Sequence, residues 1–384
     1  MQDYDYKVHN EKVQKVWQSY HEGNPIRIPM IIGINPRYIL LDPKYNKKKI
    51  TFKEYFENPE IMWDVQLDFC DFVAHNIYAD HEMGTPARGW TVNVDFQNTF
   101  DSPWLGCPMV YPKGEVPATR PFLMDDNKNE LLHRGIPDPF SGIMNTAKEH
   151  YENFSEKIQK GAAYKGVDVT SINKSVVNGM GTFTLACSLR GTQEFCIDLF
   201  EDTQYALDML ELITQAKIMR TKAWRKYLGL KEKSSSIWFA DDCIALLSND
   251  MYKEFVLPFH KKLFDELTDG TEGNQIHLCG DASHHFLTIR DELNVNEFDT
   301  GFPISHGKIV KELGSDVRVH GGPHVGLLLA GSIKDVAIET KRIIDEVKPH
   351  SKKFILRDAN NVAPFTPLCN IEAMYKTVNE DGFF

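Results

Sequence analysis

The second half of the chain alternates between short apolar runs and longer runs whose apolar residues recur every three or four positions. Short runs of β-branched and aromatic residues are typical of buried strands, and the longer spacing is typical of amphipathic helices. Strands are expected over 236–240, 275–278, 297–300, 317–320 and 353–357, and helices over 249–267, 283–293, 307–313, 332–347 and 367–378. Further upstream, a strand over 171–177 precedes a run over 193–199 and a long helix over 203–228. Strands that alternate with helices predict a parallel sheet and an α/β fold.

The first third of the chain has a weaker periodicity. Helices are expected over 11–21 and 59–72 and a strand over 28–32, while the Gly, Pro, Asn and Asp residues of 84–145 predict loops and short strands. We therefore expect a distorted (β/α)8 TIM barrel with an irregular α+β extension over 1–145, all in one domain over 1–384. A doubly wound open sheet is the alternative, although the chain has neither the glycine pattern of a dinucleotide site nor a phosphate-binding loop.

Composition excludes several classes of protein. With 42% hydrophobic and 25% charged residues, the chain can bury a large core, which excludes wholesale disorder. A net charge of −11 argues against nucleic acid as the main partner. No apolar run reaches the ~18 residues of a membrane helix, so no membrane span is expected. The N-terminal residues lack a signal-peptide pattern, and seven widely spaced cysteines favour free thiols, so a cytoplasmic protein is expected.

Polar and metal-binding residues follow each of the five expected strands in the second half. Active sites of parallel barrels lie at the C-terminal ends of the strands, where these residues would meet. A structural scaffold does not need such side chains there, so the pattern predicts an enzyme. The segments are Asp241-Asp242-Cys243, His277-Leu278-Cys279, Asp299-Thr300-Gly301, His320-Gly321-Gly322 and Arg357-Asp358-Ala359-Asn360-Asn361.

His277 and Cys279 are the sharpest of these candidates. Side chains two residues apart on a strand point to the same face, so an imidazole and a thiolate could bind one zinc ion. The alternative is a buried cysteine beside a hydrogen-bonded histidine. Of the adjacent pair Asp241 and Asp242, one should face the site and one should cap the next helix, and we expect Asp241 to be the ligand or general acid–base group. His320 is a spare ligand candidate, and Asp299 is a weaker signal.

Several segments resemble the uroporphyrinogen decarboxylase superfamily, which also contains zinc-dependent, corrinoid-linked methyltransferases. The resemblance is strongest over 165–384 and implies a distorted α/β barrel. The segment Met30–Arg37 lacks the arginine-rich motif of true decarboxylases, and Asp80 does not clearly match their catalytic aspartate, so the resemblance favours the methyltransferase branch. The resembling segments are 181–191, 241–248 with 252–258, 277–280, 298–301, 321–323, and 354–356 with 360–367.

In that branch His277 and Cys279 match two zinc ligands, but Asn360 stands where the third, a cysteine, is usual. The third ligand would then be Asp241, Asp358 or His320. An oxygen donor in place of a thiolate makes zinc a harder Lewis acid, which suits a methyl ether as the methyl donor.

The resemblance thus implies transfer of a methyl group from a small methylated substrate, with O-demethylation of an aromatic ether as one possibility. The acceptor would be a corrinoid carried by a partner protein. The residues expected to bind the substrate are Asp299, Arg357, Asn360 and Asn361.

Two other functions remain open at this point. The first is a metal-free carboxy-lyase in which Arg37, Arg190 and Arg357 would bind substrate carboxylates. The second is a non-catalytic corrinoid- or tetrapyrrole-binding protein with structural His277 and Cys279. The sequence leaves the oligomeric state open.

Overall fold

The computed structural model describes residues 5–174 and 179–384. Residues 1–4, at the start of the segment inspected for a signal peptide, lie outside the described residues. Residues 175–177 of the strand expected over 171–177 lie outside them as well.

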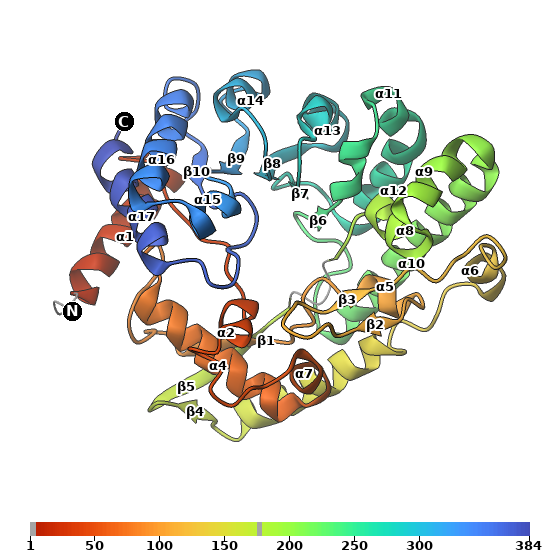
Figure 1. Cartoon of the computed structure of the whole chain (residues 1–384), viewed down its shortest axis with the longest axis horizontal. Coiled ribbons are helices and arrows are strands. Elements are labelled where there is room, and N and C mark those ends of the chain that lie inside the picture. Colours follow the sequence, from red (N-terminus) through yellow and green to blue (C-terminus); the bar gives the residue numbers. More distant parts are fainter. Residues whose placement is uncertain (1–4, 175–178) are drawn as a thin grey trace.

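A parallel five-stranded sheet forms the centre of the α/β fold, in the order β10-β9-β8-β7-β6 (Figure 1). Single parallel bridges extend it at both edges, from Met30 to Leu356 and from Met180 to Ala240. The strand expected over 28–32 is therefore reduced to one bridge. The five strands are β6 (Trp238–Ala240), β7 (Asn274–Leu278), β8 (Val295–Thr300), β9 (Arg318–Gly321) and β10 (Phe354–Leu356).

The remaining strands form two smaller sheets. In the first, β1 pairs in parallel with β5, and β4 pairs antiparallel with β5. In the second, β2 and β3 form an antiparallel pair within the loop-rich region. Their bounds are β1 (Trp90–Asn93), β2 (Met109–Val110), β3 (Ala118–Thr119), β4 (Ala163–Tyr164) and β5 (Val167–Asn173).

Helices surround the central sheet (Figure 1). Those of the first half are α1 (Tyr6–His21), α2 (Arg37–Leu41), α3 (Phe52–Glu57), α4 (Pro59–Asn76), α5 (Asp101–Trp104), α6 (Glu130–Arg134), α7 (Ile143–Gln159), α8 (Thr182–Arg190) and α9 (Thr192–Glu201). Those of the second half are α10 (Thr203–Tyr227), η2 (Asp242–Leu246), α11 (Asn249–Met251), η3 (Tyr252–Val256), α12 (Leu257–Leu267), η4 (Ser283–His285), α13 (Phe286–Leu293), α14 (His306–Leu313), α15 (Val325–Ala330), α16 (Ile333–Val347) and α17 (Leu368–Asp381).

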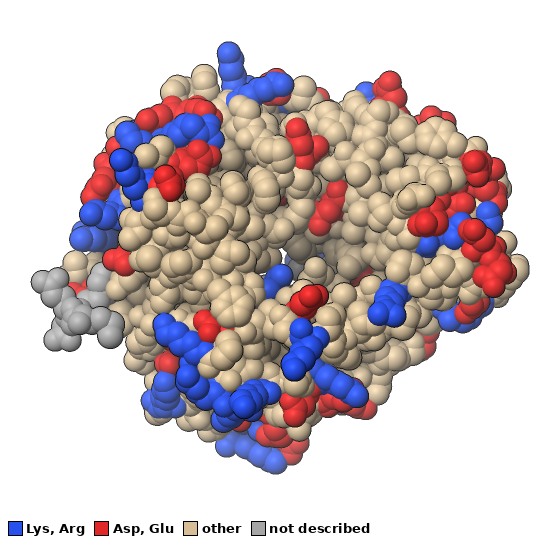
Figure 2. Space-filling view, in the orientation of Figure 1, with Lys and Arg blue, Asp and Glu red and all other residues tan. Residues whose placement is uncertain are grey.

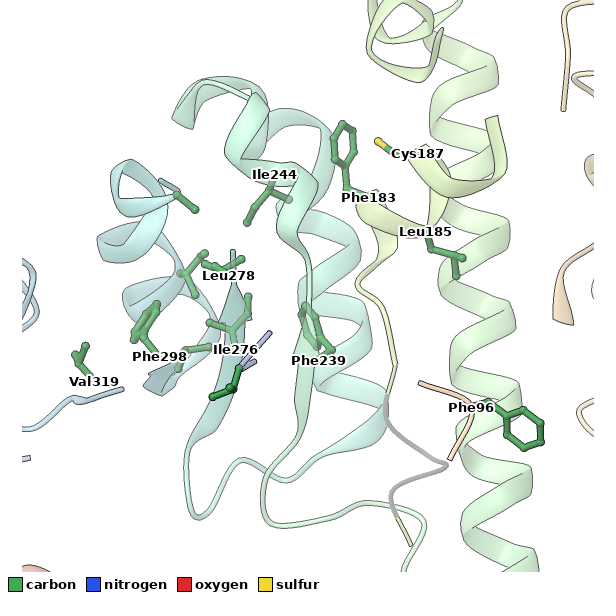
Figure 3. Packing of buried hydrophobic residues seen from close by; sticks show 14 of the residues in the cluster. Phe96, Phe183, Leu185, Cys187, Phe239, Ile244, Ile276, Leu278, Phe298 and Val319 are labelled. Atoms are coloured by element: carbon green, nitrogen blue, oxygen red, sulfur yellow. The ribbon is translucent and has the colours of Figure 1, made fainter. Parts of the chain in front are cut away.

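The strands divide their side chains between two environments. Ile276, Phe298 and Val319 are almost fully buried in the hydrophobic core, part of which Figure 3 shows. Because strand side chains alternate, their neighbours His277 and Asp299 point to the other face, where their side chains meet. The face of the sheet opposite Ile276, Phe298 and Val319 is therefore polar and carries the candidate site residues.

The helix expected over 249–267 is present and uninterrupted, with one local change: its middle part, η3, is π-helical between α11 and α12. Pro258, in the first turn of α12, has no N–H to donate to the preceding turn, which explains the wider winding there. Helix α8 was not predicted because Phe183, Leu185, Ala186 and neighbouring residues bury it on most sides, which leaves no amphipathic stripe.

All seven cysteines are free thiols. Among the described residues, no helix combines the length and the apolar character needed to span a membrane.

Candidate metal centre

The ends of the adjacent strands β6 and β7 bring three metal-binding groups together. His277 and Cys279 project from the end of β7 with 3.0 Å between Nε2 and Sγ. Asp242, the first residue of η2, places Oδ1 3.9 Å from His277 Nε2 and accepts a hydrogen bond from the Cys279 backbone N–H at 2.7 Å. One ligand atom from each residue lies within 4.8 Å of the other two.

This donor set fits zinc. Ligands 2.0–2.3 Å from a tetrahedral zinc ion lie about 3.3–3.6 Å from one another. The separations of 3.0 and 3.9 Å from His277 Nε2 bracket that range, so small side-chain adjustments suffice. Three protein ligands, here nitrogen, sulfur and oxygen, leave a fourth position for substrate, as in catalytic zinc sites.

A buried carboxylate orients His277. Asp299 Oδ2 lies 2.8 Å from His277 Nδ1, and the Arg357 guanidinium pairs with the same oxygen. Burial lowers the pKa of His277, but hydrogen bonds with Asp299 and Cys279 outweigh it and raise that pKa to about 10. A carboxylate on Nδ1 fixes the ring orientation and leaves Nε2 directed at the metal-binding position.

Asp241, the expected third ligand, lies elsewhere. It is fully buried and accepts hydrogen bonds from the Phe183 and Thr184 backbone N–H groups, at 3.1 and 2.7 Å, and from His260 Nε2 at 2.7 Å. Asp241 therefore caps the N-terminus of α8, and its neighbour Asp242 faces His277 and Cys279. Asp241 packs tightly against Gly181, because a Cβ atom added to Gly181 would lie 2.2 Å from the Asp241 side chain.

The other two candidates for the third ligand lie outside the three-residue cluster. Asp358 is fully buried, and its Oδ1 accepts the Gly33 N–H at 2.6 Å. Burial raises the pKa of Asp358 to about 7. His320 faces Glu297, with 3.1 Å between Nε2 and Oε1.

Asn360 reaches the cluster from the segment after β10. Its Nδ2 donates to Cys279 Sγ at 3.1 Å, and its Oδ1 accepts the Asn361 N–H at 2.9 Å. The backbone φ of Asn360 is +100°, a left-handed value that asparagine tolerates better than most residues. The structure thus brings a hydrogen-bond donor to the place where the resemblance leads one to expect a thiolate.

The three arginines considered for a carboxy-lyase are already engaged. Arg190 is buried and pairs with Asp198 and Asp125, and Arg357 pairs with Asp299. Arg37 donates to Asn35 Oδ1 at 2.8 Å.

Comparisons with known proteins find relatives in both sequence and fold. Two curated relatives are each named methylcobamide:CoM methyltransferase MtbA. The protein from Methanosarcina acetivorans is 21% identical over 197 residues, which is 51% of this chain and 55% of that protein. The protein from Methanosarcina mazei is 22% identical over the same length, again 51% of this chain and 55% of that protein. The chain thus matches about half the length of these relatives.

A solved structure, a methyltransferase from Methanosarcina mazei, has the same fold. Its TM-score is 0.66 at 18% identity, and the alignment covers 96% of this chain and 98% of that one. Residues 96–380, well over half of the chain, match the family model described as Uroporphyrinogen decarboxylase (URO-D). The chain belongs to the uroporphyrinogen decarboxylase family.

Proposed function

We propose that this protein transfers a methyl group between a small methylated substrate and a corrinoid carried by a partner protein, with zinc held by Asp242, His277 and Cys279. The observation that supports this most is the convergence of the three donor atoms within 4.8 Å at the ends of β6 and β7. The curated relatives, by their names, act on a methylcobamide, which supports a corrinoid as one reactant.

We further propose a methyl ether, with an aromatic ether as one candidate, as the methyl donor. Zinc bound here would act as a Lewis acid toward the ether oxygen. A ligand set with one thiolate and one carboxylate makes the ion a harder Lewis acid, which favours this role. The O–CH3 bond breaks, and the reduced corrinoid of the partner supplies the electron pair of the new bond to the methyl carbon. The oxygen keeps the electron pair of the broken O–CH3 bond and takes a proton from water.

The surrounding residues have separate roles in this proposal. Asp299 and Arg357 act through His277, which they hold in one orientation with hydrogen bonds to Nδ1 and to each other. Asn360 donates to Cys279, Asn361 is bonded to Asn360, and we propose that both contact the methyl donor. Asn360 also donates a hydrogen bond to the thiolate. This bond withdraws electron density from the sulfur, so the zinc ion would remain a hard Lewis acid.

Two measurements test the proposal. Purified protein is expected to hold about one zinc per chain, and the Cys279→Ala variant is expected to lose it. Cys369→Ala is the matched control, because Cys369 is an exposed free thiol outside the cluster. Methyl transfer is then measured from a panel of methyl ethers to cob(I)alamin, followed by the absorbance of methylcobalamin.

Full activity in metal-free protein would contradict the role of zinc. Zinc-loaded protein that methylates neither cob(I)alamin nor a corrinoid protein, with any donor of the panel, would contradict methyl transfer itself.

A further inference from the structure

A cavity of about 400 Å³ lies between α2, α4 and the loop 42–50, outside the metal centre. Its floor is apolar, with Ile39 and Leu40 from α2 and Val65 and Phe72 from α4. Lys44, Lys47 and Lys48 line its rim. We call these residues the lysine pocket.

The charge of the rim is opposite to that of the molecule. The chain carries a net charge of −11, yet Lys44, Lys47 and Lys48, together with the adjacent Lys49, are all exposed. In the described part of the chain, no carboxylate lies within 4.0 Å of any of these four ammonium groups. Their positive charge is therefore available to a partner.

The acidic residues of the pocket are already engaged. Asp68 accepts a hydrogen bond from the Tyr164 hydroxyl at 2.6 Å, and Asp71 pairs with Lys165 at 2.7 Å. The loop itself is held in place by Asn46, whose Nδ2 donates to the carbonyls of Leu40 and Ile50 at 2.7 and 2.8 Å. The backbone of the loop that carries the lysines is therefore held in place, which lowers the conformational entropy lost on binding.

The segment that leads into the lysine pocket is bound to the end of the central sheet. Gly33 is bound to Asp358 at the end of β10, and α2 begins four residues later at Arg37. Figure 2 shows Lys and Arg side chains gathered over α2 and α4, on the face that is hollowed at its centre. A macromolecule seated on this face would contact the pocket and cover the hollow together.

We propose that the lysine pocket docks an acidic face of the partner protein that carries the corrinoid, with one large apolar side chain of that partner in the cavity. This inference rests on the methyl-transfer function proposed above. Opposite charge speeds the encounter and selects the partner, and a buried apolar anchor supplies affinity. A free corrinoid has no acidic protein surface, so its reaction does not depend on the lysines.

The test compares two acceptors of the methyl group. The triple variant Lys44→Glu, Lys47→Glu, Lys48→Glu is assayed with free cob(I)alamin and with a corrinoid protein that the wild-type enzyme methylates. For the corrinoid protein, KM is expected to rise about tenfold or more at low salt, with kcat little changed, and the difference from wild type should shrink as salt rises. For free cob(I)alamin, the rate is expected to match that of the wild type.

The control variant carries the same charge change at exposed lysines elsewhere, Lys12→Glu and Lys15→Glu on α1 with Lys311→Glu on α14. An unchanged KM for the corrinoid protein in the pocket variant, or an equal rise in the control, would overturn the docking site. A wild-type enzyme inactive with both acceptors would contradict the methyl-transfer proposal rather than the docking site alone.

Discussion

Within the described residues, the Cys279 sulfur has hydrogen-bond contacts with two side chains, His277 Nε2 at 3.0 Å and Asn360 Nδ2 at 3.1 Å. These contacts differ in chemistry, because the histidine can share a metal ion with the sulfur whereas the amide N–H can only donate to it. In the proposed zinc site, the side chains that would bind the metal are therefore separable from the amide that would adjust the sulfur.

The first prediction concerns the two adjacent aspartates. Asp242→Asn is expected to lower zinc affinity about 10-fold or more, because the carboxylate charge is lost from the ligand set. Asp241→Asn is expected to destabilise the fold instead, since it weakens the cap of α8 and the bond to His260. Zinc titration and chemical denaturation of both variants distinguish the two effects. Equal zinc affinity in Asp242→Asn and wild type would refute the assignment.

The second prediction concerns the carboxylate behind His277. Asp299→Asn is expected to weaken zinc binding by about 10–100-fold, the usual effect of removing the partner of a metal-binding histidine. The physical reason is that Nδ1 loses its charged acceptor and the ring loses its fixed orientation. Competition with a chelator measures the affinity. The spectrum of the cobalt-substituted protein shows whether the ligand geometry has changed. An unaltered zinc affinity would show that Asp299 does not support the metal site.

Sequence reasoning placed His277 and Cys279 together but did not identify which aspartate lies beside them. Side-chain alternation correctly placed His277 and Cys279 on one face, because β7 continues to Leu278. The same rule could not choose between Asp241 and Asp242, since β6 ends at Ala240. The partners that turn Asp241 away, Thr184 and His260, lie 57 and 19 residues distant in the chain.

Among the elements, the strands of the central sheet and their connecting helices were predictable because each has a clear apolar period. The segment around Met30 was not, because it contributes a single bridge and is held mainly by polar contacts. Arg27 forms a bidentate pair with Asp80 at 2.7 and 2.6 Å, and Asp80 Oδ2 also accepts the Met30 N–H at 2.7 Å. Such contacts between residues about fifty positions apart leave no periodic signal in the sequence.

The third prediction follows from that pair. Asp80→Asn is expected to lower the free energy of unfolding by about 3–5 kcal/mol, because the buried Arg27 charge loses its partner. Both side chains of the pair are almost fully buried. Glu57→Gln breaks the exposed pair with Lys53 and should cost less than about 1 kcal/mol. Urea denaturation compares the two variants, and similar midpoints would show that the buried pair does not hold this segment.

At the scale of the whole molecule, buried histidines make stability depend on pH. Burial lowers the pKa of His306 to about 4, with a smaller contribution from Arg342. Burial also lowers the pKa values of His81 and His285 to about 4. An unfolded chain binds these protons near pH 6.5, so between pH 6.5 and 4 the unfolded state holds protons that the native state lacks.

The fourth prediction is therefore that the free energy of unfolding falls as pH falls through this window. Each buried histidine contributes about 1.4 kcal/mol per pH unit. His306→Gln should reduce the slope by that amount, whatever its effect on stability at pH 7. His350→Gln, at an exposed histidine, is the control and should leave the slope unchanged. Denaturation series at several pH values measure the slope, and parallel curves for His306→Gln and wild type would contradict the prediction.

The contact between Asn360 and Cys279 has a consequence for the shape of the sheet. Asn360 follows β10 and Cys279 follows β7, and these strands stand three places apart in the order β10-β9-β8-β7-β6. In a flat sheet, strands three places apart are separated by about 14 Å, yet the two side chains are 3.1 Å apart. The curvature of the sheet and the four residues from Arg357 to Asn360 together close this distance. A change that moves the end of β10 away from the end of β7 would therefore break the contact at the Cys279 sulfur.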